Sequence, residues 1–272
     1  MSARKSYVVE TLRRAQLVEL LSKGRRLDGR GLSEPRKLEI QTGLIEKANG
    51  SALVNLGNTQ VMAGVKVDKG TPFPDTPDKG LLIVGAEVLP LAASYVEAGP
   101  PDESAIELAR VVDRGVRESE MIDLSTLVIK EGKFVYSVFV DVNVLNVDGN
   151  LFDATSYAVV SALLTANMPK FVMDGDSVKN TGEKMPVPVH KIPVSLTMAS
   201  IAGSLIVDPT AEEEAVMDAR ITLTSDDEGH ICAGQKGEAG ALTVAQILQA
   251  ADWAIAQGKE VRAVIKGATG RA

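Results

Sequence analysis

The stretch that decides the fold is LEIQTGLIEKANGSALVNLGNTQVMAGVKV, residues 38–67. The segments on either side of Asn49-Gly50, residues 38–45 and 51–56, alternate or run apolar as β-strands do, and Asn-Gly between them is a hairpin turn signal. A Gly-Asn-Thr turn and a third strand over residues 60–67 follow. The stretch therefore predicts an antiparallel β-meander near the start of the chain.

Downstream of this meander, strand and helix patterns alternate along the chain. The Pro-rich segment 71–79 is unsuited to a central strand and predicts an exposed loop. Ser104 with Glu107 forms a capping-box pattern that opens a helix ending at about Glu118. The other periodic segments predict strands over residues 81–89, 127–130, 134–147, 193–198, 204–207, 218–224 and 230–233, and helices over residues 153–167 and 243–257. The polar, turn-rich segment 174–189 is the best candidate for a domain boundary, so two similar lobes are expected.

Composition places the chain among globular proteins. It has 272 residues, 45% of them hydrophobic and 24% charged, which is enough to bury a substantial core. The single Cys232 excludes an internal disulfide framework and fits a reducing compartment. Residues 1–24 are predicted to form a helix and not a leader, and no apolar run is long enough to span a bilayer, so a cytoplasmic location is expected. The net charge of −7 argues against a general nucleic-acid binder, so any contact with RNA should be local.

The predicted helix that ends at Glu118 carries a stripe of arginines. Arg110, Arg114 and Arg117 fall at i, i+4 and i+7 and share one face. The opposite face is apolar and should be buried; it consists of Ala105, Leu108, Val112 and Val116. The planar guanidinium suits an RNA phosphate. Asp113 is also spaced to form ion pairs with the first and third arginine, and Glu118 with the second, so a solvated, salt-bridged face is the alternative.

Five short motifs occur in one order along the chain: Arg26-Leu27-Asp28-Gly29-Arg30-Gly31, Gly50-Ser51-Ala52-Leu53-Val54, and residues 57–65, 148–154 and 229–237. Together they resemble the RNase PH family of phosphorolytic exoribonucleases, over nearly the whole chain. Within that family the chain is most similar to the non-catalytic RNase PH-like subunit of the archaeal exosome. The resemblance implies an α+β fold, the RNase PH fold, with duplicated β/α lobes of the ribosomal protein S5 domain 2-like type. The implied division is an N-terminal helix over residues 1–24, domain 1 over 25–173 and domain 2 over 190–272.

The resemblance also implies a function. A catalytically silent subunit would alternate with a catalytic RNase PH-like partner in a hexameric ring that degrades single-stranded RNA from its 3′ end with inorganic phosphate. The ring would carry RNA-binding cap proteins. By the same similarity, the arginines of this helix would reach the RNA path beside the partner's active site. Arg110 and Arg114 are the strongest candidates for RNA binding, and Arg117 is the third.

Two departures from the family pattern argue that the chain is not itself an enzyme. Active members hold phosphate on a Gly-Gly-Ser/Thr-Arg loop, whereas Gly149-Asn150-Leu151-Phe152 offers neither the hydroxyl nor the arginine. The next residue, Asp153, would repel phosphate and is better suited to the start of a helix. Active members also place an Asp before an Ile/Leu-Pro pair, and here Lys191 precedes Ile192-Pro193. A surface lysine at a strand start is the simplest interpretation of Lys191, although a cation there could attract an anion.

No other cluster indicates catalysis. His190 and His230 have no neighbouring pattern that resembles a zinc site, so no metal, no cofactor and no catalytic residue is expected. Two alternatives to the silent subunit stay open at this point. One is an RNase PH-type phosphorolytic exoribonuclease that is active by itself, and the other is a structural scaffold whose arginine stripe is only a salt-bridged subunit contact.

Overall fold

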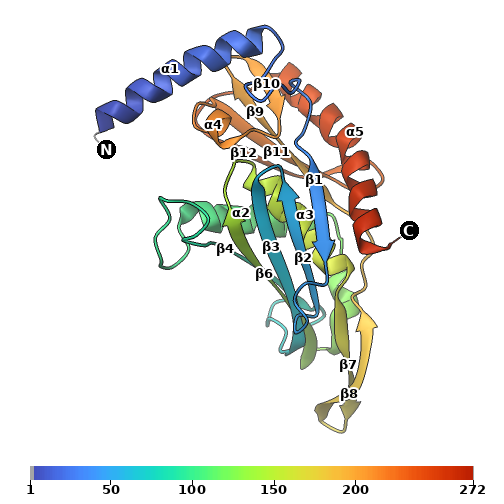
Figure 1. Cartoon of the computed structure of the whole chain (residues 1–272). Helices are drawn as coiled ribbons and strands as arrows, with labels where there is room; N and C mark the ends of the chain where they lie inside the picture. The colour runs from blue at the N-terminus through green and yellow to red at the C-terminus, as the bar shows by residue number, and fades with distance from the viewer. Residues whose placement is uncertain (1–2, 272) are drawn as a thin grey trace.

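The computed structural model describes the backbone of residues 3–271 and the side chains of residues 13–271, and it folds into two lobes with a buried helix between their sheets (Figure 1). The first lobe is built on a six-stranded sheet with the order β1-β2-β3-β6-β4, and β5 also pairs with β6. Only β4 and β6 run parallel. The strands are β1 (Leu38–Thr42), β2 (Gly50–Leu56), β3 (Thr59–Gly70), β4 (Leu81–Val88), β5 (Val128–Lys130) and β6 (Phe134–Asn146). The mixed α/β architecture confirms the predicted fold class.

The meander predicted from residues 38–67 is present, with one correction. Strands β1, β2 and β3 pair antiparallel, and Leu56 pairs with Thr59 across a two-residue turn at the predicted Gly-Asn-Thr segment, whose threonine already belongs to β3. The prediction of a tight Asn49-Gly50 turn is wrong, because the chain between β1 and β2 runs over residues 43–49. Gly50 already belongs to β2, where an added Cβ would lie 2.3 Å from the carbonyl oxygen of Ala162. The glycine serves close packing of the sheet on a helix and not a turn.

That helix, α3 (Leu151–Leu164), is the centre of the molecule. Twelve of its residues carry apolar or small side chains, and every residue from Phe152 onward is buried. It lies against β2 and β3 of the first lobe and β9 of the second. The hydroxyl of Tyr157 donates a 2.9 Å hydrogen bond to the carbonyl of Ser195 in β9. Helix α3 therefore couples the two lobes through its whole surface.

The second lobe repeats the arrangement of sheet and helix on a smaller scale. Its antiparallel sheet has the order β10-β9-β11-β12. Its elements are β9 (Val194–Ile201), β10 (Ser204–Val207), α4 (Ala211–Glu214), β11 (Ala219–Ser225), β12 (Ile231–Gly237) and α5 (Val244–Thr269). Helix α5 continues twelve residues beyond the predicted end at residue 257. Trp253, the only tryptophan of the chain, is a residue of α5 and packs against the core of this lobe, which includes Leu196 and Leu223.

Helix α1 (Ala3–Ser22) begins the chain, and its C-terminal part packs on the second lobe (Figure 1). Leu17 and Leu21 pack with Ile206 and its neighbours in the second sheet. Arg14 donates a 2.7 Å hydrogen bond to Asp218. No helix within residues 3–271 is both long and apolar enough to cross a membrane.

The polar, turn-rich segment 174–189, taken as the best candidate for a domain boundary, is in large part a β-strand that the sequence pattern did not predict. Strands β7 (Asn167–Asp174) and β8 (Ser177–Pro186) form an antiparallel hairpin that projects from the first lobe (Figure 1). The rings of Phe171 and Tyr136 are 5.4 Å apart, and the Phe171 amide donates a hydrogen bond to the tyrosine hydroxyl. Polar residues occupy the exposed face of this hairpin, which explains why its sequence resembles a loop. The predicted domain limits of 1–24, 25–173 and 190–272 stay a prediction.

Candidate functional site

The arginine stripe lies on helix α2 (Glu103–Glu118), as predicted, but the helix begins before Ser104. Asp102 is the N-cap, and its carboxylate accepts a 2.8 Å hydrogen bond from the amide of Ala105. Ser104 is therefore a residue of the first turn and not the cap. The four apolar positions predicted to face inward are all buried: Ala105, Leu108, Val112 and Val116. The three arginines are exposed on the other side, and we call Arg110, Arg114 and Arg117 the arginine face.

The three arginines differ in how they are held. Arg117 forms an ion pair with Asp113, with nitrogen–oxygen distances of 2.8 and 3.1 Å, and also donates to the carbonyl of Leu82. Arg114 makes only long contacts of 3.5 and 3.4 Å, to the carbonyl of Gly234 and the side chain of Gln235. Among residues 13–271, Arg110 has no ion-pair partner. The salt-bridged alternative therefore holds for Arg117 alone, and two guanidinium groups remain available to an anion.

Contacts with the second lobe hold α2 in place. Glu107 of α2 accepts a 2.8 Å hydrogen bond from Arg220 of β11, which is buried. Gly115 of α2 faces β11 so closely that an added Cβ would lie 3.2 Å from the hydroxyl of Thr224. The arginine face is thus presented next to β12 by packing and by one ion pair between the lobes.

The loop that matches the family's phosphate-binding segment is filled by the chain itself. Asn150 is the N-cap of α3 and has a left-handed backbone conformation with φ of 52°. Its backbone N–H donates a 2.8 Å hydrogen bond to the carboxylate of Glu214. Burial raises the pKa of Glu214 to about 7, and the hydrogen bond from Asn150 opposes this rise. The ring of Phe152 lies 4.1 Å from the guanidinium carbon of Arg220, which is already paired with Glu107. An internal carboxylate and an aromatic ring thus lie beside the loop that the resemblance matches to the family's phosphate-binding segment.

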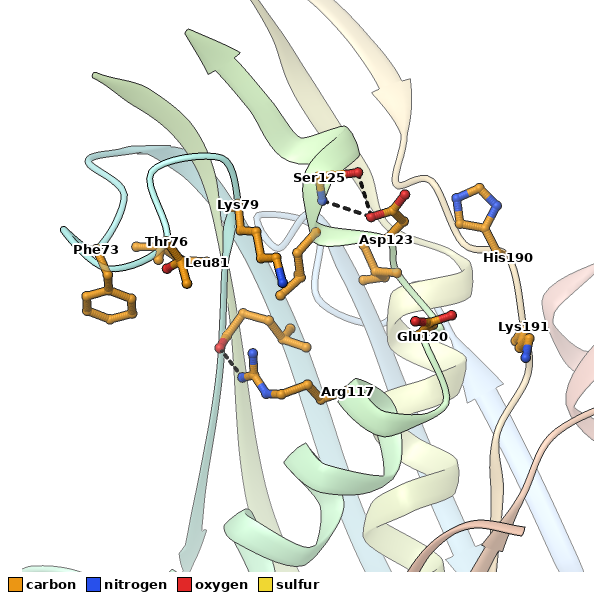
Figure 2. Close-up of a pocket in the computed structure, with 14 residues that line it drawn as sticks. Phe73, Thr76, Lys79, Leu81, Arg117, Glu120, Asp123, Ser125, His190 and Lys191 are labelled. Atoms are coloured by element: carbon orange, nitrogen blue, oxygen red, sulfur yellow. Dashed lines mark hydrogen bonds between the residues drawn. The ribbon is translucent and has the colours of Figure 1, made fainter. Parts of the chain in front are cut away.

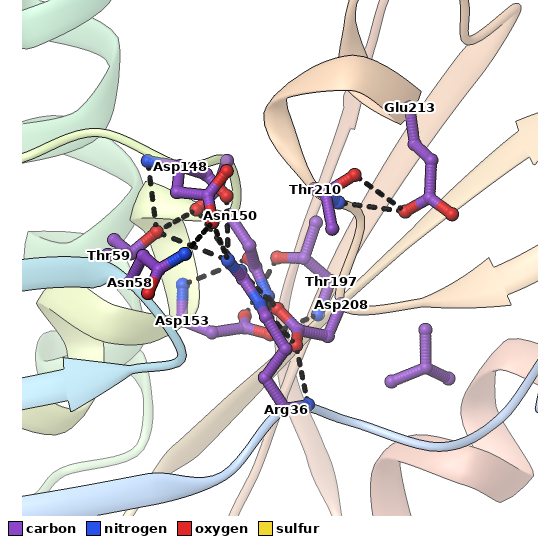
Figure 3. Close-up of polar contacts among 12 residues, drawn as sticks. Arg36, Asn58, Thr59, Asp148, Asn150, Asp153, Thr197, Asp208, Thr210 and Glu213 are labelled. Atoms are coloured by element: carbon purple, nitrogen blue, oxygen red, sulfur yellow. Dashed lines mark hydrogen bonds and ion pairs between the residues drawn. The ribbon is translucent and has the colours of Figure 1, made fainter. Parts of the chain in front are cut away.

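Asp153 lies in the first turn of α3, as predicted, and belongs to a buried polar cluster that joins the lobes (Figure 3). This inter-lobe cluster consists of Arg36, Asn150, Asp153, Thr197 and Asp208. Asp153 accepts hydrogen bonds of 2.8 to 2.9 Å from the side chain of Asn150 and from the amide and hydroxyl of Thr197. Burial raises the pKa of Asp153 to about 7 in spite of these donors.

Arg36 and Asp208 form the charged part of the inter-lobe cluster (Figure 3). Arg36 also donates hydrogen bonds to the carbonyls of Asp148 and Gly149, at the end of the phosphate-type loop. Burial raises the pKa of Asp208, but hydrogen bonds and charge from Arg36 outweigh it and hold the pKa below its ordinary value. Sequence analysis assigned Arg36 no role. The only signal was a cluster of arginines at residues 25–36, and their partners lie some 170 residues away in the chain.

A second arginine of that cluster is buried as well. Arg26, from the first motif, has a fully buried side chain that donates a 2.9 Å hydrogen bond to Glu213 of α4. It also donates to the carbonyls of Val207 and Asp208. Arg26 therefore anchors the first motif to the second lobe.

Lys191 is partly exposed and its ammonium lies 3.1 Å from a carboxylate oxygen of Asp226. Burial raises the pKa of Asp226, but hydrogen bonds from the His230 amide, Lys191 and the His230 ring lower it to about 2.

Possible metal-ligand atoms of Asp226, Glu228 and His230 lie within 4.8 Å of one another, an arrangement that sequence analysis missed. The Asp226 carboxylate is already satisfied by Lys191 and by two backbone amides, so the arrangement has the character of a capped turn.

The chain matches models of two domains. The model described as "3′ exoribonuclease family, domain 1" matches residues 34–169, and "3′ exoribonuclease family, domain 2" matches residues 191–257. The relative named Exosome complex component Rrp42 from Thermococcus gammatolerans is 48% identical over 268 residues, covering 97% of this chain and 98% of the relative. The protein of the same name from Pyrococcus furiosus is 47% identical over 267 residues, covering 97% and 96%.

Solved structures give the same picture. A chain of the Archaeoglobus fulgidus exosome with RNA bound to the active site has a TM-score of 0.86 and 43% identity, covering 94% of this chain and 98% of that one. A chain of an archaeal exosome core has a TM-score of 0.84 and 42% identity, covering 95% and 98%. Rice Rrp46 has a TM-score of 0.69 at 17% identity, covering 89% and 98%, and shares the fold.

Proposed function

This chain belongs to the 3′ exoribonuclease family of RNase PH, and from that premise we propose that it is the non-catalytic, RNA-guiding subunit of an exosome. Its catalytic partner is a homologous RNase PH-like subunit with which it alternates in a hexameric ring. The ring degrades single-stranded RNA from the 3′ end by phosphorolysis, and RNA-binding cap proteins sit on it. The names of the relatives, and the neighbouring exosome structures, support the place in the complex.

The observation that carries the proposal is the loop at the start of α3. Phosphorolysis requires a phosphate held in line with the RNA linkage, by donors aimed at its oxygens. Here the amide of Asn150 is engaged by Glu214, and Leu151 and Phe152 supply no polar group. The guanidinium of Arg220 stacks on Phe152 and pairs with Glu107, and that of Arg36, at the other end of the loop, pairs with Asp208. The side chain of Glu214 thus takes up the Asn150 backbone amide, which is then not free to bind inorganic phosphate.

The contact of Lys191 supports the same conclusion. Active family members need a carboxylate before the Ile-Pro pair, whereas Lys191 is a cation that pairs with Asp226. The same ion pair neutralises the Asp226 carboxylate, which lies in the second lobe beside Lys191. An RNase PH-type phosphorolytic exoribonuclease that is active by itself would need both features, so we set this alternative aside.

The role in RNA guidance rests on the arginine face. Arg110 and Arg114 are exposed and lack close acidic partners within residues 13–271, so each can donate a charge-assisted hydrogen bond to phosphate. Arg117 is oriented by Asp113 and contributes less. The alternative is a scaffold whose arginine stripe is only a salt-bridged subunit contact, and it predicts that loss of Arg110 and Arg114 loosens the ring without changing RNA affinity.

The proposal is tested by reconstitution. The purified chain, the catalytic partner and their co-expressed complex are compared for phosphate-dependent release of nucleoside diphosphates from a single-stranded RNA. We expect no release by the chain alone, and full activity only in the complex. Activity of the chain without the partner would exclude catalytic silence. Equal activity of partner rings that lack this chain would exclude its proposed role.

A further inference from the structure

The C-terminal end of the arginine face opens on a cavity that the proposed function has not yet used (Figure 2). Its volume is about 660 Å³, within the range of roughly 300–1,000 Å³ that is typical of small-molecule sites. The β3–β4 loop, the end of α2 and the chain that crosses between the lobes supply its walls. The residues that matter for its chemistry are Phe73, Lys79, Arg117, Glu120 and Asp123.

The β3–β4 loop is held in shape by its own backbone. The amide of Thr76 donates to the carbonyl of Phe73, and the amide of Lys79 donates to the carbonyl of Thr76. The loop is fastened to the lobe by a 2.8 Å hydrogen bond from Gly80 to Leu124 and by one of 2.9 Å from Gly132 to Pro77. A wall built this way needs little ordering when a ligand binds, which favours affinity.

Phe73 is held at the rim of the cavity with 56% of its surface exposed. An exposed ring on an ordered loop gains nothing from the core of the lobe. Aromatic side chains that line grooves for single-stranded nucleic acids stack on bases in this position. The exposed ring therefore indicates a ligand that has a flat, aromatic part.

Charges are separated across the cavity. Figure 2 shows Lys79 and Arg117 on one side and Asp123 and Glu120 on the other. Lys79 is exposed and has no ion pair within residues 13–271. Arg117 is oriented by Asp113 and Leu82, and among the described residues its Nη1 atom has no hydrogen-bond acceptor. Such a site offers cations to a phosphate and carboxylates to the amino groups of a base.

From this placement we propose that the cavity is a subsite for one nucleotide of single-stranded RNA, with the base on Phe73 and the phosphate between Lys79 and Arg117. It rests on the proposed function, since it extends the RNA path of the arginine face. Arg110 and Arg117 are seven residues apart, so the path from one to the other is about 10 Å along the helix. An RNA strand that follows the arginine face toward the C-terminal end of α2 therefore reaches the cavity without leaving the protein surface.

Photo-crosslinking of the assembled complex tests the subsite. A single-stranded RNA that carries 4-thiouridine is bound, irradiated, and the crosslinked peptides are identified by mass spectrometry. We expect crosslinks within residues 71–80. Phe73→Ala should weaken binding of this RNA about fivefold or more, since a stacked base is worth on the order of 1–3 kcal/mol. Phe73→Tyr should bind as the wild type does, and Lys79→Glu should weaken binding by a factor that shrinks as salt rises.

Matched controls keep the test specific. Tyr95→Ala removes an aromatic ring that is 74% exposed on another loop, and Lys47→Glu reverses an exposed charge outside the cavity. Both should leave RNA binding unchanged, and all variants should melt at the wild-type temperature. Unchanged affinity of Phe73→Ala and Lys79→Glu, with no crosslink within residues 71–80, overturns the subsite and leaves the arginine face to its own test. Crosslinks within residues 71–80 in a complex that has no phosphorolytic activity would support the subsite and overturn the proposed function.

Discussion

Arg36 and Asp208 form a bidentate ion pair across the two lobes, with Nε to Oδ2 at 2.9 Å and Nη2 to Oδ1 at 2.7 Å. The Asp208 carboxylate also accepts hydrogen bonds from the amide of Arg36 and the side chain of Asn150, and its side chain is almost fully buried. A buried carboxylate with this many donors holds three separate segments of the chain together. Its loss would leave guanidinium groups without a counter-charge.

We therefore expect Asp208→Asn to lower the free energy of unfolding at pH 7 by about 3–5 kcal/mol, the usual cost of breaking a buried ion pair. The pKa of Asp208 is lowered in the folded state, so its contribution is present above the ordinary Asp value of about 4 and is lost as pH falls through the folded pKa. The deficit of the variant should therefore shrink in acid. Urea unfolding from pH 7 to pH 3 measures it. Asp176→Asn, an exposed carboxylate with only distant lysine partners, is the control and should change stability by less than about 1 kcal/mol.

Gly149, in the loop before α3, packs against the backbone of residues 209–211 at the start of α4. It has φ of 79°, and an added Cβ would lie 2.5 Å from the amide nitrogen of Ala211. Gly149→Ala should lower the free energy of unfolding by at least about 3 kcal/mol, from backbone strain and from the clash. Gly175→Ala is a matched control, because φ is 61° there and nothing lies within 4 Å of the added atom. The control should lose only about 1–2 kcal/mol, and equal losses in thermal melts would show that no close contact exists at Gly149.

Asp153 should give the protein a pH dependence of the opposite sign. Its pKa is about 7 when folded and about 4 when unfolded, so between these values the folded state holds more protons. Stability should then fall as pH rises from 4 to 7, by about 1.4 kcal/mol per pH unit for one such group. Glu214, also with a pKa of about 7, adds to the same trend. Asp153→Asn should flatten the curve measured by urea unfolding, and Glu214→Gln should flatten it further in the double variant. An unchanged slope in the double variant would contradict the raised pKa of both groups in the folded state.

Arg110→Glu with Arg114→Glu should weaken RNA binding at least tenfold in the assembled complex, because each charge-assisted contact is worth about 1.5–3 kcal/mol. The ring should stay intact, since both side chains are exposed. The double change to Ala should have a smaller effect, and the difference between the two should shrink as salt rises. Ring mass by light scattering and RNA affinity, measured on one preparation, distinguish a loss of RNA contacts from a loss of the ring. Intact rings with wild-type affinity would remove both arginines from the RNA path.

Lys191→Asp alone should not create a phosphorolytic enzyme. The new carboxylate would face Asp226 without its present cation, and the loop at the start of α3 would still lack a phosphate site. Catalytic groups that act as a unit are strongly non-additive, so one restored group has little effect. The assay is release of nucleoside diphosphates by the purified variant. Appreciable release would mean that Glu214 and Phe152 do not block phosphate.

The sequence predicted the elements whose pattern is local. The meander of residues 38–67 and the buried face of α2 follow from periods of two and 3.6 residues. The end of α5 was missed because its last turns contain Gly258 and Gly267, which weaken a helical pattern. The β7–β8 hairpin was missed because one of its faces is polar and exposed. Both errors arise where tertiary packing, and not local preference, decides the structure.

The site divides in the same way. The exposure of the arginine face could be predicted from spacing on α2, whereas its pairing could not, because Asp113 had two possible partners. Arg36 and Asp208 lie 172 positions apart, and no local pattern links them. The contact of Glu214 with Asn150 joins residues 64 positions apart and is also not visible in any local pattern, although the missing arginine had already indicated a loop without phosphate.

The position of Trp253 gives the two lobes separate optical signals. The only tryptophan packs within the second lobe, whereas Tyr95 and Tyr136 lie in the first and Tyr157 lies on α3 between the two. Tryptophan fluorescence therefore follows the second lobe alone, while far-ultraviolet circular dichroism follows both. If the inter-lobe cluster makes the chain one cooperative unit, the two signals change together during unfolding. A variant that loosens this cluster would let them separate, so the native chain carries its own reporter of communication between its halves.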